Sequence, residues 1–209
     1  MPSDLTPIRI GICGSASVGK TTLANALARD LHLPCLQEEM RAFLERTRLD
    51  LTSLPAPERE AILLQMWADR RHRESSTPSF IADNSPLDFA AYALYYGHLS
   101  DCGLDTLLAE ARTFLAHYTT VLILPWGALP YQQDGIRASS PHLQMRYQVL
   151  IEGLLLRHLP HERLHFLPTH LLRLEDRLRW AKSHLPAQPA TPNPALLHPE
   201  PRQHNRSAQ

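Results

Sequence analysis

Residues 14–21 read GSASVGKT and fit the pattern G-x-x-x-x-G-K-[ST] with no mismatch. The two glycines permit a tight turn in which successive backbone N–H groups point inward and form a nest for an anion. Lys20 can reach the outer phosphates of a nucleotide as a point charge, and Thr21 can offer its hydroxyl to Mg²⁺. We therefore predict a phosphate loop that uses ATP and Mg²⁺ as cofactors. Its binding residues are Gly14, Ser15, Ala16, Ser17, Val18, Gly19, Lys20, Thr21 and Thr22.

Lysine is rare in this chain, which draws attention to Lys20. Of the 21 basic residues, only Lys20 and Lys182 are lysines, and the others are arginines. One of these two lysines occupies the position where the loop pattern requires lysine. We therefore predict that Lys20 is a catalytic residue as well as a binding residue.

A phosphate loop needs a strand before it and a helix after it, and the sequence supplies both. The run before the loop is β-rich, and the run after it places leucines on one helical face. The same alternation continues along the chain, which predicts an α/β protein with a parallel sheet. The predicted strands cover 8–13, 33–37, 79–83, 119–125 and 163–168, and the predicted helices cover 20–31, 39–48, 57–75, 86–98, 104–117, 141–158 and 171–184.

Acidic residues follow two of these strands, and ligands of an open parallel sheet gather at the carboxyl ends of its strands. Asp83 ends the third predicted strand, where a carboxylate can hold Mg²⁺ or its water; the alternative is a helix cap, a task for which Ser85 is better placed. Glu38 and Glu39 follow the second strand and can act as general base, and Glu39 is preferred. Glutamate in a first helical turn also stabilises the helix without a ligand, and Asp88 suits that role. The residues leave Glu38, Glu39 and Asp83 open as the base.

A long irregular segment, 126–144, follows the fourth predicted strand. A loop of this length in a compact domain is usually functional and is typical of a lid. Arg137 lies within it, and we predict that Arg137 offsets the charge of a transferring phosphoryl group, with Arg146 as a second candidate. The alternative is that Arg137 is an exposed loop arginine.

The long helix predicted at 57–75 carries Gln65 and Arg70 as weaker candidates for substrate contact. Arg70, Arg71 and Arg73 lie near its C-terminal end, where arginine suits the helix dipole without any ligand. The residues therefore favour a structural role for this helix.

Length and composition indicate one domain, predicted over residues 1–185, followed by a Pro-rich tail at 186–209 that we expect to be disordered. The formal net charge is +0, which predicts no broad basic face for nucleic acid. No apolar run is long enough to span a membrane, and the first residues do not resemble a signal peptide. We therefore expect a cytoplasmic protein with no membrane or nucleic-acid partner.

Cysteine and histidine predict no further metal site. Cys13, Cys35 and Cys102 lack a metal-binding spacing, and we predict that they are buried free thiols in a reducing compartment. Four of the 12 histidines lie close in sequence, but they straddle a helix end, a strand and a turn, so no single face collects them. They are His158, His161, His165 and His170.

Taken in order, these motifs resemble the small P-loop nucleoside and nucleotide kinases. The resemblance extends to the AAA-like ATPase/kinase group that includes the ribosylnicotinamide kinase domain of NadR. It rests on GSASVGKTTLANALA, on Glu38-Glu39-x-Arg41, on IADNSPLD leading into a helix that ends YYG, and on DGIR before a helix. These motifs run from residue 8 to about residue 158.

The resemblance implies a three-layer α/β/α P-loop NTPase fold with a five-stranded parallel sheet and the loop strand in the centre. It also implies phosphoryl transfer from ATP with Mg²⁺ to a small acceptor. It casts Asp83 as the metal or base carboxylate and Arg137 as the lid arginine. The chain departs from the related kinases at Asn84, because many of them have arginine at this position.

We predict a P-loop kinase that acts on a nucleoside-like or nucleotide-like small molecule. The alternatives are an ATPase or nucleotide-dependent switch that acts through a protein partner, and a nucleotide-binding module without turnover. A GTPase is disfavoured because the chain has no Asn/Thr-Lys-x-Asp motif: Lys182 precedes Ser-His-Leu. A large AAA+ motor is also disfavoured, because little sequence follows residue 185 to form a helical lid domain. The residues leave the acceptor and the oligomeric state open.

Overall fold

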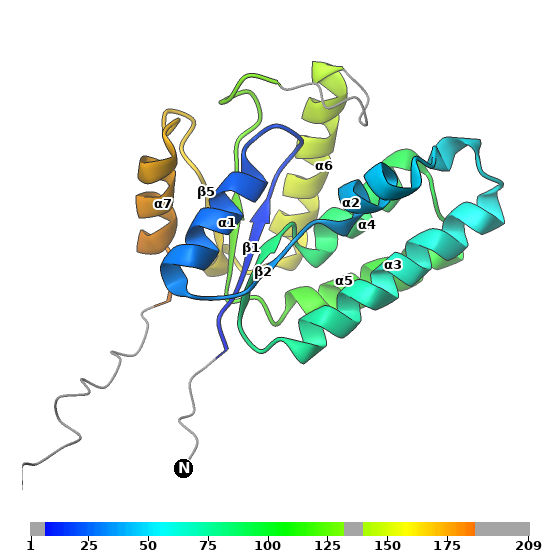
Figure 1. Cartoon of the computed structure of the whole chain (residues 1–209), viewed down its shortest axis with the longest axis horizontal. Helices are drawn as coiled ribbons and strands as arrows, with labels where there is room; N and C mark the ends of the chain where they lie inside the picture. The colour runs from blue at the N-terminus through cyan, green and yellow to red at the C-terminus, as the bar shows by residue number, and fades with distance from the viewer. Residues whose placement is uncertain (1–6, 132–139, 187–209) are drawn as a thin grey trace, which may run out of the picture.

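The five strands form one parallel sheet, which confirms the predicted α/β class. The computed structural model describes residues 7–131 and 140–186. The strand order is β2-β3-β1-β4-β5, so the strand that leads into the phosphate loop is central (Figure 1). The strands are β1 (Arg9–Cys13), β2 (Cys35–Leu36), β3 (Phe80–Asp83), β4 (Thr120–Ile123) and β5 (Leu164–Phe166).

Every predicted helix is present among the described residues. The helices are α1 (Lys20–Leu31), α2 (Glu39–Thr47), α3 (Ala56–Ser76), α4 (Pro86–Tyr96), α5 (Asp101–Leu115), α6 (Pro141–His158) and α7 (Leu174–Ser183), with short 3₁₀ turns η1 (Leu51–Ser53) and η2 (His161–Arg163). The prediction placed the start of α5 too late. The helix begins earlier because the Ser100 side chain accepts a hydrogen bond from the Gly103 N–H and caps it.

Two hydrophobic clusters cover the two faces of the sheet and make three layers (Figure 1). On one face, α1 and α7 pack on alternate strand residues such as Ile10 and Ile12. On the other face, α3, α4, α5 and α6 pack around Phe80, Val121 and Ile123. The alternation follows from the strand geometry, in which successive side chains point to opposite faces. Both faces are therefore buried, as a parallel sheet requires.

A third cluster joins α2 and η1 to α3, away from the sheet. Its buried residues are Met40, Leu51, Leu63 and Met66. Phe89 and Tyr92 of α4 pack against this cluster, and α2 overlaps α4 in the view of Figure 1. We call residues 39–53, from α2 through η1, the arm. Met40 and Leu51 of the arm line the same cavity as residues that follow β1 and β3, such as Gly14 and Asn84.

Gly11 in β1 makes room for the aromatic ring of Tyr118. A Cβ at Gly11 would lie 3.1 Å from Cε1 of Tyr118, which is fully buried. Tyr118 is thereby held where its hydroxyl reaches Glu74 of α3. A larger residue at Gly11 would displace this contact.

Some predictions are corrected or fall outside the described residues. Cys13 is buried and Cys35 is half-buried, but Cys102 is exposed, so the prediction that all three thiols are buried is wrong. Cys102 lies in the first turn of α5, beyond the packed face of that helix. Apart from Pro186, the tail predicted at 186–209 lies outside the described residues.

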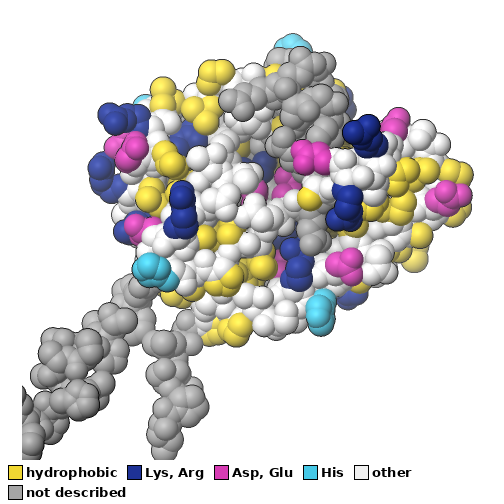
Figure 2. All heavy atoms as spheres, viewed as in Figure 1, with side chains coloured by type: hydrophobic (Ala, Val, Ile, Leu, Met, Phe, Trp, Pro, Cys, Tyr) yellow, Lys and Arg dark blue, Asp and Glu magenta, His cyan; other side chains and the backbone are white. Residues whose placement is uncertain are grey.

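Residues 7–131 and 140–186 contain neither a membrane-spanning helix nor a metal-binding cluster of side chains. None of the helices there combines the length and the apolar character that crossing a membrane requires. No group of three or more His, Cys, Asp or Glu side chains that could hold a metal ion occurs there. On the face shown in Figure 2, the described basic and acidic side chains are interspersed and form no continuous basic area.

Candidate functional site

The phosphate loop (residues 14–21) has left-handed backbone at several positions. The φ angles are +136° at Gly14, +63° at Ser17 and +88° at Gly19. Gly14 also has no space for a side chain, because a Cβ there would lie 2.7 Å from the Leu124 carbonyl oxygen. Glycine is therefore required at Gly14 for both conformation and close approach. The loop leads directly into α1, whose N-terminus attracts an anion.

Lys20 lies across the loop that precedes it. Its Nζ donates to the carbonyl oxygens of Gly14, at 2.9 Å, and Ser15, at 2.7 Å. The residue is only 8% exposed, so the ammonium is held in a largely buried position. A cation held there beside a helix N-terminus attracts phosphate.

Thr21 and Asp83 meet although they are far apart in sequence. The Thr21 hydroxyl donates to Oδ2 of Asp83 over 2.6 Å. Burial raises the pKa of the Asp83 carboxyl, while the Lys20 ammonium and the Thr21 hydrogen bond lower it and the Glu38 charge raises it. Oδ1 of Asp83 is buried and has no hydrogen-bond partner among the described residues. The Thr21 hydroxyl and the Asp83 carboxylate, one oxygen of which is orphaned, are oxygen groups that suit Mg²⁺.

Two glutamines of α6 bind the first amides of the loop. Oε1 of Gln148 accepts from the Ser15 N–H at 2.7 Å, and Oε1 of Gln144 accepts from the Ala16 N–H at 3.0 Å. Nε2 of Gln148 donates to the Leu124 carbonyl just beyond β4. These contacts tie the start of the loop to α6 and to the neighbouring strand.

Arg177 of α7 binds the loop from another side. Its Nη1 donates to the Val18 carbonyl over 2.8 Å, and its Nε donates to the Leu171 carbonyl. Arg177 is buried, and burial lowers its pKa. Sequence analysis did not select Arg177, Gln144 or Gln148, because the residues they bind lie more than a hundred positions away along the chain.

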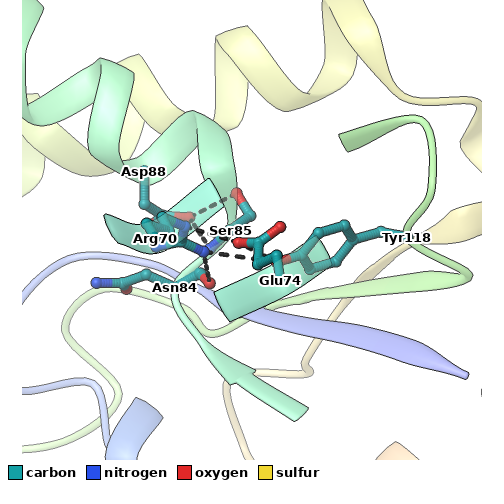
Figure 3. A network of polar contacts seen from close by, with 6 residues as sticks. All are labelled: Arg70, Glu74, Asn84, Ser85, Asp88 and Tyr118. Atoms are coloured by element: carbon teal, nitrogen blue, oxygen red, sulfur yellow. Dashed lines mark hydrogen bonds and ion pairs between the residues drawn. The ribbon is translucent and has the colours of Figure 1, made fainter. Parts of the chain in front are cut away.

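The turn after β3 is held by a buried polar network (Figure 3). Asn84 has a φ of +85°, a conformation that asparagine tolerates better than most non-glycine residues. Nη2 of Arg70 donates to the Asn84 carbonyl at 2.9 Å, and Nε of Arg70 pairs with Glu74 at 2.7 Å. The Tyr118 hydroxyl also donates to Glu74. The network fixes the backbone next to Asp83, which is a more specific role than the dipole interaction predicted for Arg70.

Burial opposes the charge of Arg70, but the Glu74 carboxylate and the Tyr118 hydroxyl together more than offset this effect, so the pKa of Arg70 is raised. Arg70 therefore remains a cation inside the protein. Burial also raises the pKa of Tyr118, which keeps its hydroxyl protonated as a donor. The i,i+4 spacing of Arg70 and Glu74 was a signal available in the sequence.

The same turn is capped as predicted. Oδ2 of Asp88 accepts from the N–H and the hydroxyl of Ser85, each at 2.8 Å, and these contacts belong to a capping box at the start of α4. Asp88 is buried, and burial raises its pKa. Burial and the neighbouring Asp88 carboxylate raise the pKa of the Cys13 thiol. The first-turn role expected for Asp88 is therefore confirmed.

A cavity of about 610 Å³ begins at the phosphate loop and continues to the arm. We call its loop side the donor end, which is lined by Gly14, Ala16, Lys20, Asn84 and Gln144. We call its arm side the acceptor end, which is lined mainly by Met40, Leu44, Arg48, Asp50, Leu51, Tyr92, Tyr96 and His98. Glu38 also lines the cavity, so one of the candidates for the general base faces the same space as both ends.

Aromatic rings dominate the acceptor end. The Tyr96 ring stacks on His98 with centroids 5.3 Å apart and an interplanar angle of 14°, and Tyr92 lies 4.7 Å from Tyr96. His98 is buried, and burial and Arg59 lower its pKa while Asp50 raises it. Hydrogen bonds from Thr52 lower the pKa of Asp50. A flat ring system can stack on such a surface while neighbouring polar groups form hydrogen bonds with the edge of that ring.

The remaining candidates have different outcomes. The side chain of Glu39 and all of Arg137 lie outside the described residues, which also cover only the two ends of the segment predicted as a lid. The Arg146 guanidinium lies 5.5 Å from the centre of the Tyr95 ring. Gln65 is exposed and donates to Asp69, away from the cavity.

Comparison with known proteins places the chain in a family. A family model described as "AAA domain" matches residues 9–170, which includes the phosphate loop, Asp83 and α6. The chain belongs to the AAA domain family. No curated protein sequence matches this AAA domain.

Solved structures with a similar fold include P-loop nucleoside and nucleotide kinases. NadR in complex with NR matches this AAA domain with a TM-score of 0.62 and 20% identity, over 86% of this chain and 52% of NadR. Deoxyadenosine kinase from M. mycoides matches with a TM-score of 0.60 and 11% identity, over 84% of this chain and 97% of that enzyme. Thymidylate kinase from Ehrlichia chaffeensis matches with a TM-score of 0.54 and 16% identity, over 85% and 98% of the two chains. This AAA domain therefore has the P-loop kinase fold and spans about half the length of NadR.

Proposed function

We propose that the protein is a kinase that transfers the γ-phosphoryl group of ATP, with Mg²⁺, to a nucleoside-like or nucleotide-like small molecule such as ribosylnicotinamide. The observation that carries this proposal is the cavity that joins the phosphate loop to the aromatic acceptor end. A kinase needs space for two substrates at one reacting centre. An ATPase that only hydrolyses has no need of the second space.

At the donor end, the backbone N–H groups of the phosphate loop and the Lys20 ammonium bind the phosphates. The residues present fit Mg²⁺, because Thr21 and Asp83 adjoin and one Asp83 oxygen is orphaned. When bound there, Mg²⁺ neutralises charge on the phosphates and orients them. Asp83 and Thr21 are the residues that would hold it.

At the acceptor end, Tyr92 and Tyr96 stack on the acceptor's ring. Its hydroxyl points back toward the donor end, where the oxygen attacks the γ-phosphorus and the bond to the β-phosphate oxygen breaks, releasing ADP. Glu38 takes the hydroxyl proton as general base because it lines the cavity and lies close enough to influence the pKa of Asp83. Glu39 and Asp83 remain the other base candidates.

The charges around the cavity favour an acceptor without a phosphate of its own. Glu38, Glu45 and Asp50 line it, whereas Arg48 is the basic lining residue on the arm side among the described residues. Recognition of an acceptor phosphate usually employs several arginines. This balance supports a nucleoside-like acceptor over a nucleotide-like one.

Arg137 keeps its proposed role at the transferring phosphoryl group.

The test is ATP consumption by the purified protein with Mg²⁺, alone and against a panel of nucleosides, nucleotides and ribosylnicotinamide. Turnover that requires one acceptor, together with mass-spectrometric detection of the phosphorylated acceptor, supports the proposal and identifies the substrate. Hydrolysis that is independent of every acceptor would instead support the alternative, an ATPase or nucleotide-dependent switch that acts through a protein partner. The Lys20→Ala variant controls for contaminating kinases.

A further inference from the structure

The two α6 glutamines that bind the phosphate loop are used differently. They lie one turn apart, and each must present Oε1 to the loop, because the Ser15 and Ala16 N–H groups are donors. Nε2 of Gln148 then donates to the Leu124 carbonyl at 3.1 Å and to Glu152 at 2.6 Å. Both the oxygen and the amino group of the Gln148 carboxamide therefore form hydrogen bonds within the protein.

Gln144 occupies a different place. It lines the cavity together with Gly14, Ala16 and Lys20, whereas Gln148 does not line it. The hydrogen bond to Ala16 uses only the acceptor end of its carboxamide. Exchange of the two carboxamide ends would break that bond, so Oε1 stays on the loop and Nε2 is the end left for a ligand, on a residue that lines the donor end of the cavity.

We propose that Gln144 is a catalytic residue that donates a hydrogen bond from Nε2 to an oxygen of the γ-phosphoryl group. The inference rests on the proposed function. A neutral amino group adds a donor beside Lys20 without adding charge, and its position is set before ATP binds because Ala16 holds Oε1. Such pre-organised donors stabilise charge that develops during transfer.

The test measures the affinity for the γ-phosphoryl group without any turnover. Isothermal titration calorimetry gives the Kd of Mg²⁺-ADP and of Mg²⁺-AMP-PNP, a non-hydrolysable ATP analogue, for the wild type, Gln144→Glu and Gln144→Leu. The measured quantity is the Kd of Mg²⁺-ADP divided by the Kd of Mg²⁺-AMP-PNP, which is larger when the γ-phosphoryl group adds affinity. A hydrogen bond to a charged group contributes enough that both variants should lower this ratio about tenfold or more. Gln65→Leu, which alters an exposed glutamine on α3, should leave the ratio unchanged.

Gln144→Glu separates a catalytic role from a structural one. A glutamate oxygen still accepts from the Ala16 N–H but cannot donate to phosphate, so the proposal expects Gln144→Glu to be at least as defective as Gln144→Leu. A Gln144→Glu variant with the wild-type ratio would overturn the proposal, because only the loop contact would then matter. Equal wild-type affinity for the two nucleotides would overturn it as well. Retained binding of Mg²⁺-ADP shows that each variant is folded.

The ratio does not depend on the acceptor. Wild-type protein that prefers AMP-PNP but phosphorylates no acceptor in the panel would contradict the proposed kinase function and leave the Gln144 test intact. Conversely, a kinase whose nucleotide ratio is insensitive to both Gln144 variants would keep the proposed function and lose this inference. The two failures are therefore distinguishable.

Discussion

The donor end of the cavity takes its main chemical groups from one continuous loop, whereas the acceptor end combines side chains from α2, η1 and α4. Three long-range side chains hold the loop in place: Gln144, Gln148 and Arg177. The acceptor end instead rests on contacts among aromatic rings and on the small cluster around Met40. One end therefore depends on backbone geometry and the other on side-chain packing.

This difference has a functional consequence. A site made of backbone N–H groups recognises phosphate, which every nucleoside triphosphate carries. Under the proposed function, a site made of rings and carboxylates would recognise the shape and charge of one acceptor. We therefore expect changes at the donor end to lower the rate with every acceptor, and changes at the acceptor end to alter which acceptor binds.

The largest effect is expected for Lys20→Ala. Removing the ammonium should lower kcat/KM for transfer by about 10³-fold or more, because a pre-organised charge on the phosphates is lost. The fold should persist, since within residues 7–131 and 140–186 the Lys20 ammonium bonds to carbonyls of its own loop. Steady-state kinetics and circular dichroism check both expectations. Full activity in this variant would contradict the assignment of the donor end.

Asp83→Asn should give the next largest effect. The amide oxygen can still accept from Thr21, but the charge that suits Mg²⁺ is lost. We expect kcat to fall about 10²-fold while the affinity for nucleotide changes much less. A titration of Mg²⁺ against rate, with nucleotide binding measured separately, distinguishes the two quantities. Equal losses in binding and in rate would argue against a metal-holding role.

Tyr96→Leu probes the acceptor end. Loss of one stacking surface should raise KM for the acceptor about tenfold and leave KM for ATP unchanged, because base–aromatic stacking contributes roughly 1–3 kcal/mol. Phe166→Leu is the matched control, since Phe166 is an exposed aromatic residue of β5 outside the cavity lining. If KM for ATP rose instead, the two ends would be wrongly assigned.

The smallest effect concerns pH and His98. Burial and the Arg59 charge lower the pKa of His98 from its ordinary value of 6.5, and the Asp50 charge opposes them only in part. The folded state therefore favours neutral His98. The resulting stability is present above pH 6.5 and is lost as pH falls through the lowered pKa. We expect the acid-induced drop in Tm to be about 1–3 °C smaller in His98→Gln than in the wild type. Parallel Tm curves for the two proteins would refute this linkage.

Much of the donor end was predictable from the sequence, because its information is local. The loop pattern, the β-rich run before it and the helix after it lie within one stretch of chain, and the structure has β1 and α1 at those positions. The Ser85 cap was predictable for the same reason. Asp83 needed one further rule, that ligands gather at the carboxyl ends of parallel strands.

The acceptor end was not predictable in this way. Tyr92, Tyr96 and His98 read in the sequence as an ordinary helix and its end, and nothing local connects them to Asp50 or Met40. Their meeting depends on how α2 and η1 pack on α3, which the sequence pattern does not encode in any fixed spacing. The partners of Arg70 on other elements were not predictable for the same reason, since Tyr118 lies 48 positions away along the chain.

The sequence by itself determined the phosphate loop, the α/β alternation and the carboxylate that ends β3, because short-range backbone conformation and hydrophobic periodicity specify them. Only the tertiary structure decided which side chains hold the loop, which rings line the cavity and which carboxylate lies beside Thr21. The contacts that hold the loop and the contact between Thr21 and Asp83 each join residues more than sixty positions apart. Contacts at such separations arise when packed elements meet, and packing depends on the shape of the whole core.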